Sequence, residues 1–162
     1  MARLVLTDAS PLIGLSIVGG LPWLKGLFGE VWMPIEVERE VLSGRVSCGE
    51  EDLRGALVDK WLRIFQPTPD EPEFPELDEG EAACIRVALS IQEETLILMD
   101  VRAGRSIAIE QGLLVAGTAA VIGMAKTRGL IPSARDIFAR FHNSDFRIAT
   151  EVIQTVLHRV GE

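Results

Sequence analysis

The residues of this sequence that most clearly indicate a chemical function are four acids that lie far apart along the chain: Asp8, Glu40, Glu81 and Asp100. Asp8 ends an apolar run at 4–6, and Asp100 ends another at 96–99. Glu40 and Glu81 lie within helix-like segments. Carboxylates that gather without a basic partner repel one another, and a divalent cation is the usual compensation. The pattern therefore predicts a hard metal ion held by oxygen ligands.

Glu81 lies on the apolar face of its expected helix. Its neighbours three, four and seven residues later are Cys84, Ile85 and Ala88, which form one stripe. An acid on such a stripe is rare unless it has a partner. The alternative is a first-turn glutamate that the helix dipole favours.

The other three acids each have a simpler explanation as well. Glu40 can belong to a solvated acidic helix, in which Glu36 shares its face. Asp8 can cap the helix that follows it, although Ser10 competes for that position. Asp100 can be an ordinary turn residue. Their shared placement, more than any one residue, favours a common site.

Alternating elements must position these acids. Apolar runs predict short strands near 3–8, 31–33, 61–65, 95–99 and 113–115. Helix signals predict helices near 10–18, 21–28, 35–42, 50–57, 78–91, 104–111, 118–127, 133–141 and 148–160, with loops at 43–49 and 66–77. We expect Ser10 and Asp78 to cap two of these helices, and Pro132-Ser133 to open a third.

This alternation predicts an α/β fold with a mainly parallel sheet covered on both faces. Ligands of such sheets bind beyond the carboxyl ends of the strands, which is where Asp8 and Asp100 fall. At 162 residues the chain is expected to form a single domain spanning 1–162.

Composition excludes several classes of protein. The net charge of −8 argues against a nonspecific coat on nucleic acid. No uncharged apolar stretch reaches membrane-spanning length, and the nearest one, at 9–29, is interrupted and has no basic leader, so we expect neither a membrane span nor a signal peptide. Cys48 and Cys84 are too few for a disulfide framework, which favours a cytoplasmic location.

Other catalytic chemistries find little support. The two histidines, His142 and His158, lie in the expected C-terminal helices, away from the strand ends. No GxGxxG or GxxxxGK[ST] loop is present to bind a nucleotide. The second half carries a basic set, which is either a phosphate-contacting surface or a group of solvated helix charges: Arg102, Arg105, Lys126 and Arg128.

The motifs around the acids resemble those of PIN-domain proteins. The similar segments are TDASPLI at 7–13, PIEVEREV at 34–41, LDEGEA at 77–82 and LMDVRAGR at 98–105. Gly117-Thr118, Ala125-Lys126 and residues 129–131 are similar to a VapC-like bacterial and archaeal subgroup with an extended C-terminal part. The resemblance covers nearly the whole chain.

The resemblance implies a three-layer α/β/α fold with four to five strands and a ribonuclease that depends on Mg²⁺ or Mn²⁺, often the toxin of a toxin–antitoxin pair. It makes the four acids the catalytic set, with Asp8, Glu81 and Asp100 as metal ligands. Glu40 would either bind the metal through a water or orient the attacking nucleophile. In this interpretation Ser10 supports Asp8. Arg102 and Arg105 are expected to contact the RNA phosphate.

One departure from the subgroup leaves alternatives open. The subgroup usually has two adjacent acids at the fourth motif, and the second position here is Val101. A catalytically weakened module that binds RNA or protein is therefore an alternative to the ribonuclease, as is a structure-specific DNA nuclease.

Two protein partners are also expected. The apolar surplus in the C-terminal helices at 133–160 suggests that they form a homodimer interface. The resemblance adds an antitoxin protein as a partner.

Overall fold

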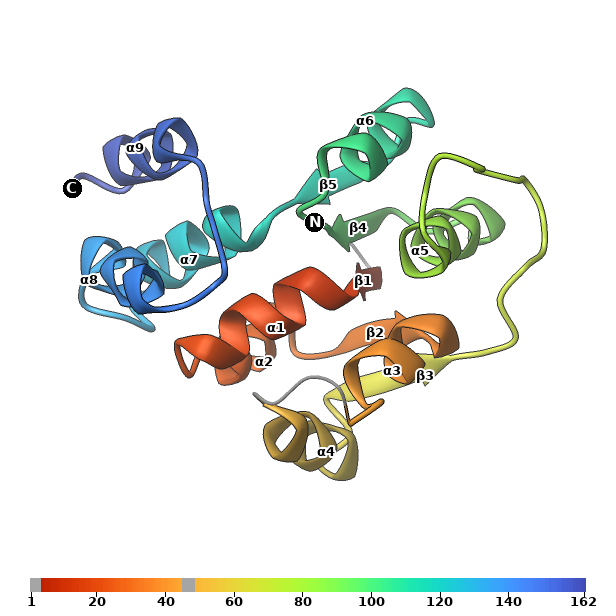
Figure 1. Ribbon diagram of the computed structural model, residues 1–162, viewed down its shortest axis with the longest axis horizontal. Coiled ribbons are helices and arrows are strands. Elements are labelled where there is room, and N and C mark those ends of the chain that lie inside the picture. The colour runs from red at the N-terminus through yellow and green to blue at the C-terminus, as the bar shows by residue number, and fades with distance from the viewer. Residues whose placement is uncertain (1–3, 45–48) are drawn as a thin grey trace.

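A computed structural model describes residues 4–44 and 49–162 (Figure 1). Five short strands form one parallel sheet in the order β3-β2-β1-β4-β5. The strands are β1 (Leu4–Thr7), β2 (Val31–Pro34), β3 (Leu62–Phe65), β4 (Thr95–Leu98) and β5 (Leu114–Ala116). Helices flank the sheet, so the predicted α/β class and parallel sheet are confirmed. Arg3, Cys48 and the centre of the expected 43–49 loop lie outside the described residues.

The helices follow the predicted segments closely. They are α1 (Ala9–Ile17), α2 (Leu21–Phe28), α3 (Ile35–Val41), α4 (Glu50–Val58), α5 (Glu79–Ser90), α6 (Arg102–Glu110), α7 (Thr118–Thr127), α8 (Ala134–Arg140) and α9 (Thr150–Arg159), with a short 3₁₀ turn at Phe141–Asn143. Asp78 caps α5 as expected, and Ser133, at the expected start of α8, also caps its helix. Ser10 was wrongly expected to cap α1, because that helix begins one residue earlier and Asp8 occupies the N-cap position. The start of α6 lies two residues before the expected one, with Val101 at its N-cap.

The central position of β1 determines where the site forms. β1 pairs with both β2 and β4, and Thr7 lies opposite Leu98 in the register. The next residue, Asp8, donates its backbone N–H to the Leu98 carbonyl at 2.9 Å. Met99 likewise donates to the Ala116 carbonyl of β5 at 2.9 Å. The chain therefore turns from strand into helix at Asp8 and at Asp100 on the same edge of the sheet.

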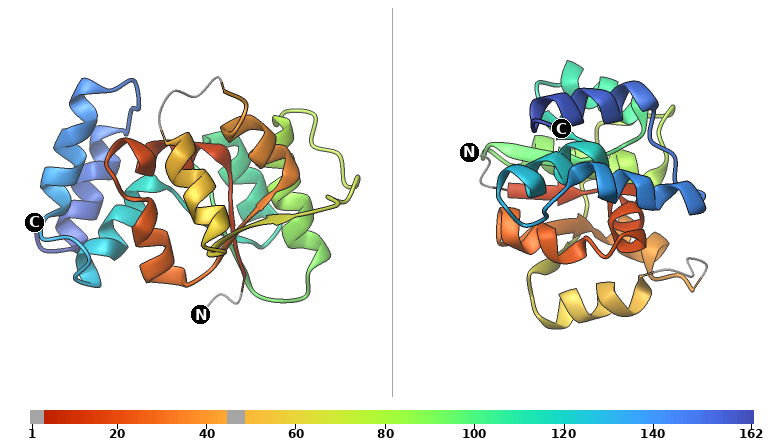
Figure 2. Two further views of the ribbon diagram at one scale, coloured as in Figure 1. Left: turned by 90° about the horizontal axis from the view of Figure 1, so that it is seen from below. Right: turned by 90° about the vertical axis from the view of Figure 1, so that its left-hand side faces the viewer.

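The C-terminal helices extend the core at one side of the molecule. Figures 1 and 2 show α8 and α9 beside α7, on the side away from α5. Val156 and Leu157 of α9 are buried, whereas Val152 is 44% exposed. The segment between α8 and α9 also reaches back to α1, where a Cβ added at Gly14 would lie 2.6 Å from the Phe146 ring. Gly14 therefore makes room for an aromatic side chain more than a hundred residues later.

No single helix in the described ranges is long and apolar enough to cross a membrane. α1 and α2 pass the length and composition test only as a pair, and they are bent by 116° relative to each other.

Adding a methyl group at Gly14 tests this long-range packing. We expect Gly14→Ala to lower the free energy of unfolding by about 1–3 kcal/mol, because the new Cβ overlaps the Phe146 ring. Gly55→Ala in α4 is the matched control, since a Cβ there meets nothing within 4 Å. The control should gain about 1 kcal/mol from helix propensity, as read from urea midpoints. Equal effects of the two changes would contradict the packing.

Candidate functional site

Carboxylates from two separate elements converge above the first turn of α5. A Cβ built on Gly80 would lie 3.0 Å from Asp8 Oδ1 and 3.4 Å from Glu40 Oε2. Asp8 comes from the end of β1 and Glu40 from the last turn of α3. The absence of a side chain at Gly80 leaves the space in which these two oxygens approach each other.

A third carboxylate, that of Glu81, is fixed by the capping box at the start of α5. The Glu81 N–H donates to Asp78 Oδ1 at 2.8 Å, and the Asp78 N–H donates to Glu81 Oε1 at 3.1 Å. Asp8, Glu40, Asp78 and Glu81 are referred to below as the carboxylate cluster. Asp78 was predicted only to cap the helix, although its spacing of three residues from Glu81 indicates that the two carboxylates lie close together.

The second oxygen of Glu81 has no protein partner. Glu81 is only 4% exposed, and its Oε2 is buried without a hydrogen-bond donor in the described part of the chain. This atom points toward the first turn of α6, 3.4 Å from the position of a Cβ on Gly104. A buried carboxylate oxygen without a donor is costly, which makes it a candidate ligand for a cation.

The cluster is electrostatically strained. Asp8 is 3% exposed, and its pKa is raised from 3.8 to about 7, chiefly by burial. The Ala9 amide opposes this shift, and the charges of Asp78, Glu81 and Glu40 contribute to it. Burial followed by the charge of Asp78 raises the pKa of Glu40, and burial also raises that of Glu81. A cation near these oxygens would relieve both costs.

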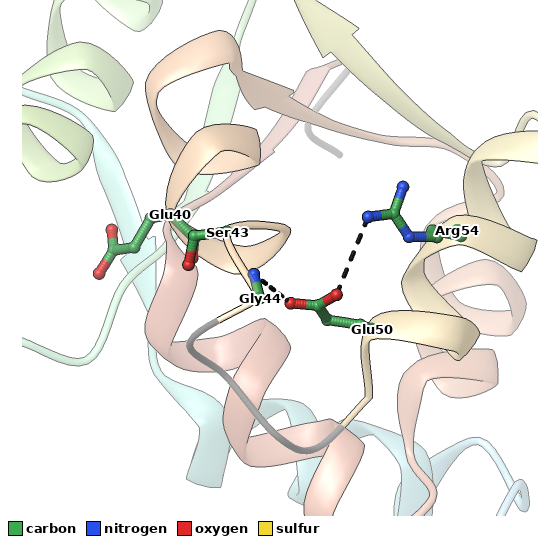
Figure 3. A network of polar contacts seen from close by, with 5 residues as sticks. All are labelled: Glu40, Ser43, Gly44, Glu50 and Arg54. Atoms are coloured by element: carbon green, nitrogen blue, oxygen red, sulfur yellow. Dashed lines mark hydrogen bonds and ion pairs between the residues drawn. The ribbon is translucent and has the colours of Figure 1, made fainter.

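No ion pair in the described part of the chain neutralises the Glu40 carboxylate. Figure 3 shows this side chain pointing away from Glu50, which pairs with Arg54 at 3.8 Å and accepts the Gly44 N–H at 2.7 Å. Ser43 donates its hydroxyl to the Glu40 backbone carbonyl at 3.0 Å, not to the carboxylate. The Glu40 side chain is thus available to the carboxylate cluster, and Arg54 does not neutralise it.

Asp100 is built differently from the other three sequence-predicted acids. Thr118 donates to it twice, from its N–H at 2.7 Å and from its hydroxyl at 2.7 Å. Ser10 adds a third hydrogen bond at 3.0 Å. The expectation that Ser10 supports Asp8 is therefore wrong, because its hydroxyl binds Asp100. The charge of Asp100 is not among the causes that raise the pKa values of Asp8, Glu40 and Glu81. Asp100 therefore ties the end of β4 to the starts of α1 and α7.

Of the two arginines expected to contact phosphate, Arg105 lies beside Asp100. Arg105 donates from Nη1 to the Met99 carbonyl at 3.1 Å. The same Nη1 and Asp100 Oδ1 would lie 3.1 and 2.9 Å from a Cβ on Gly117. Arg102 is exposed at the first position of α6. Thr118, noted in the sequence only as part of the Gly117-Thr118 pair that resembles the subgroup, donates two of the three hydrogen bonds to Asp100.

Cys84 lies close to the cluster but is not a nucleophile candidate. It is fully buried on α5, and burial followed by the charge of Asp8 raises its thiol pKa well above the ordinary value. The thiolate needed for attack is therefore strongly disfavoured.

The donor set fits a hard divalent cation, although the side chains do not form a finished coordination shell. Carboxylate oxygens are the ligands that Mg²⁺ and Mn²⁺ prefer, and Glu81 Oε2 is unsatisfied. In residues 4–44 and 49–162, no three Asp, Glu, His or Cys side chains are close enough together to hold a metal ion. Binding would require the acidic side chains to adjust.

Comparison with known proteins supports the same architecture. A family model described as a PIN domain matches residues 4–162. The structure is similar to that of a PilT N-terminus domain protein from the hyperthermophilic archaeon Sulfolobus solfataricus P2. The TM-score is 0.53 at 13% sequence identity, and the match covers 91% of this chain and 100% of that one. No protein of curated function matches the chain by sequence.

The raised pKa of Asp8 predicts that stability falls as pH rises. Between the ordinary value of 3.8 and about 7 the folded protein keeps a proton that the unfolded chain has released, so each pH step upward favours unfolding. The free energy of unfolding should drop by about 2–3 kcal/mol from about pH 5 to about pH 7.5. Asp8→Asn should flatten most of this slope in urea titrations. Asp70→Asn, on an exposed loop, should leave it intact, and an unchanged slope in Asp8→Asn would contradict the assignment.

Substitution of Val101 tests whether its position belongs to the site. Val101 is 42% exposed at the N-cap of α6 and gives that helix no side-chain cap. Both Val101→Ser and Val101→Asp should stabilise the fold by about 1 kcal/mol through capping. Only Val101→Asp should also increase the rise in urea midpoint caused by Mn²⁺, because it adds a ligand oxygen. Equal Mn²⁺ effects in the two variants would show that residue 101 contributes no ligand.

Proposed function

The chain belongs to the PIN-domain family, whose fold is nuclease-like, and from this premise we propose that it is a metal-dependent ribonuclease that hydrolyses RNA phosphodiester bonds. One observation carries the proposal. The buried Glu81 Oε2 has no donor and shares a cluster with Asp8, whose pKa burial and neighbouring acids raise to about 7. A structural ion pair would satisfy these groups with a basic residue, and no such residue pairs with either acid in the described ranges.

The proposed metal ligands are Asp8 and Glu81, joined by Asp100 if its side chain exchanges one of its hydrogen bonds. The ion would be Mg²⁺ or Mn²⁺, because all donors are carboxylate oxygens. A bound ion of this kind lowers the pKa of a coordinated water and stabilises negative charge on phosphoryl oxygens.

The chain's own residues prepare the reaction. Asp78 fixes Glu81 through the capping box, which leaves Oε2 free. Glu40 is exposed, so its carboxylate can orient an attacking water that arrives from solvent. We propose that Arg105, beside the hydrogen-bonded Asp100, and the exposed Arg102 at the start of α6 hold a phosphate of the substrate.

The family resemblance also supports a biological setting. We propose that the protein acts as one domain over residues 1–162 and as the toxin of a toxin–antitoxin pair, with an antitoxin protein as its partner. Homodimerisation is proposed through the C-terminal helices, where Val152 remains 44% exposed.

A second candidate is a non-catalytic PIN-like module that binds RNA or protein. Two observations favour it: Val101 stands where the subgroup has an acid, and the oxygens of Asp100 are already occupied by Ser10 and Thr118. Such a module would bind nucleic acid without a divalent ion and would not cleave it.

Paired glutamate variants of α5 test the ribonuclease directly. Glu81→Gln should reduce Mn²⁺-dependent cleavage of single-stranded RNA by more than about 100-fold, because it replaces a ligand oxygen with an amide. Glu79→Gln is the matched control, since Glu79 is exposed in the same helical turn and should retain the activity of the unmodified chain.

Substrate comparison separates the remaining alternatives. Cleavage of duplex or flap DNA in preference to RNA would identify a DNA nuclease. Binding of RNA without cleavage, unchanged by Glu81→Gln, would favour the non-catalytic module.

A further inference from the structure

A cavity of about 560 Å³ lies over the sheet, separate from the carboxylate cluster. Its floor includes Val5 of β1, Trp32 of β2 and Leu96 of β4. α2, α7 and α9 form its walls, and none of the cluster residues lines it. The central strands of a parallel sheet are normally covered on both faces, so an open apolar space at this place is unusual.

The walls of the cavity are mainly apolar. Leu27 and Phe28 of α2 line it together with Met124 of α7 and Val156 of α9. Gly123 of α7 allows α9 to approach closely, since a Cβ there would lie 2.8 Å from Val156 Cγ1. The volume falls within the roughly 300–1,000 Å³ of sites that bind small molecules, which are mostly apolar with a few polar groups.

The charged side chains at this cavity are two arginines and one glutamate, which together give it a net positive charge. Arg128 at the end of α7 and Arg159 in the last turn of α9 are exposed, and neither has an acidic partner among the described residues. The acid at the cavity, Glu30, is already engaged, because it accepts from Trp32 Nε1 at 2.7 Å and pairs with Arg63 at 3.2 Å. Two unpaired guanidiniums beside an apolar cavity are notable in a chain of net charge −8.

We propose that this cavity binds a small anionic amphiphile, with its apolar body over Val5, Trp32 and Leu96 and its carboxylate or phosphate between Arg128 and Arg159. The apolar body would cover the open part of the sheet. The anionic group would receive charge-assisted hydrogen bonds from the two arginines. The site does not depend on the proposed nuclease activity.

Laurate, which joins a single alkyl chain to one carboxylate, is the probe, used below its micelle concentration. Two methionine methyl groups report on the two sites when they carry ¹³C: Met124 lines the cavity, and Met99 lies beside Glu81 near Gly104. Laurate should shift the Met124 resonance with 1:1 saturation and leave Met99 in place. Mn²⁺ should broaden Met99 at lower concentrations than Met124.

Three variants test the assignment. Arg128→Ala and Arg159→Ala should each weaken laurate binding about tenfold, because each removes a hydrogen bond to a charged group. Arg135→Ala removes the same charge elsewhere and should have no effect. Ala120→Leu should reduce binding by filling the cavity, into whose lining Ala120 contributes only a methyl group.

Several results would overturn the proposal. Binding that does not saturate, or that is equal in the three arginine variants, would show detergent-like association. Dodecyltrimethylammonium binding as tightly as laurate would remove the role of the arginines. A dimer in light scattering that Ala120→Leu converts to a monomer would show that a second copy of the chain covers the cavity.

Discussion

Burial of like-charged carboxylates at the carboxyl edge of the sheet is the constraint on which the site depends. Asp8 lies at the end of the central strand and cannot move away without breaking the register between β1 and β4. Glu40 and Glu81 are carried to it by α3 and α5, and burial together with neighbouring charge raises the pKa of each of these acids. A fold that maintains such repulsion gains nothing in stability from it, and this cost is what supports the proposal of a cationic ligand.

The surrounding structure holds the acids without neutralising them. Gly80 leaves space for two of the carboxylates, and the Asp78 capping box grips only one oxygen of Glu81. Just beyond the end of β4, Asp100 accepts its hydrogen bonds from the neutral donors of Ser10 and Thr118. The apolar cavity with Arg128 and Arg159 lies apart from this arrangement and has the opposite charge. The molecule thus separates an acidic edge from a basic, apolar cavity.

Local signals in the sequence were sufficient for the α/β class, the five strands and the position of each helix, because apolar runs, caps and prolines act over a few residues. The hydrogen bonds between side chains at the site could not be predicted from the sequence in the same way. Ser10 reads as a helix cap in the sequence, yet its hydroxyl bonds a carboxylate ninety residues away. The role of Thr118 and the packing of Phe146 on Gly14 likewise depend on contacts between distant segments. Spacing along the chain does not indicate whether a donor such as the Ser10 hydroxyl binds the carboxylate of Asp8 or that of Asp100.

A crystal structure of the protein grown with Mn²⁺, with anomalous scattering recorded at the manganese edge, tests the central claim most directly. The account predicts an anomalous peak within bonding distance of Glu81 Oε2 and an Asp8 oxygen, roughly 2.0–2.6 Å as for hard cations. It also predicts that the same peak is missing from crystals of the Glu81→Gln protein. A fully occupied manganese site elsewhere, with Glu81 Oε2 still without a ligand, would contradict the account.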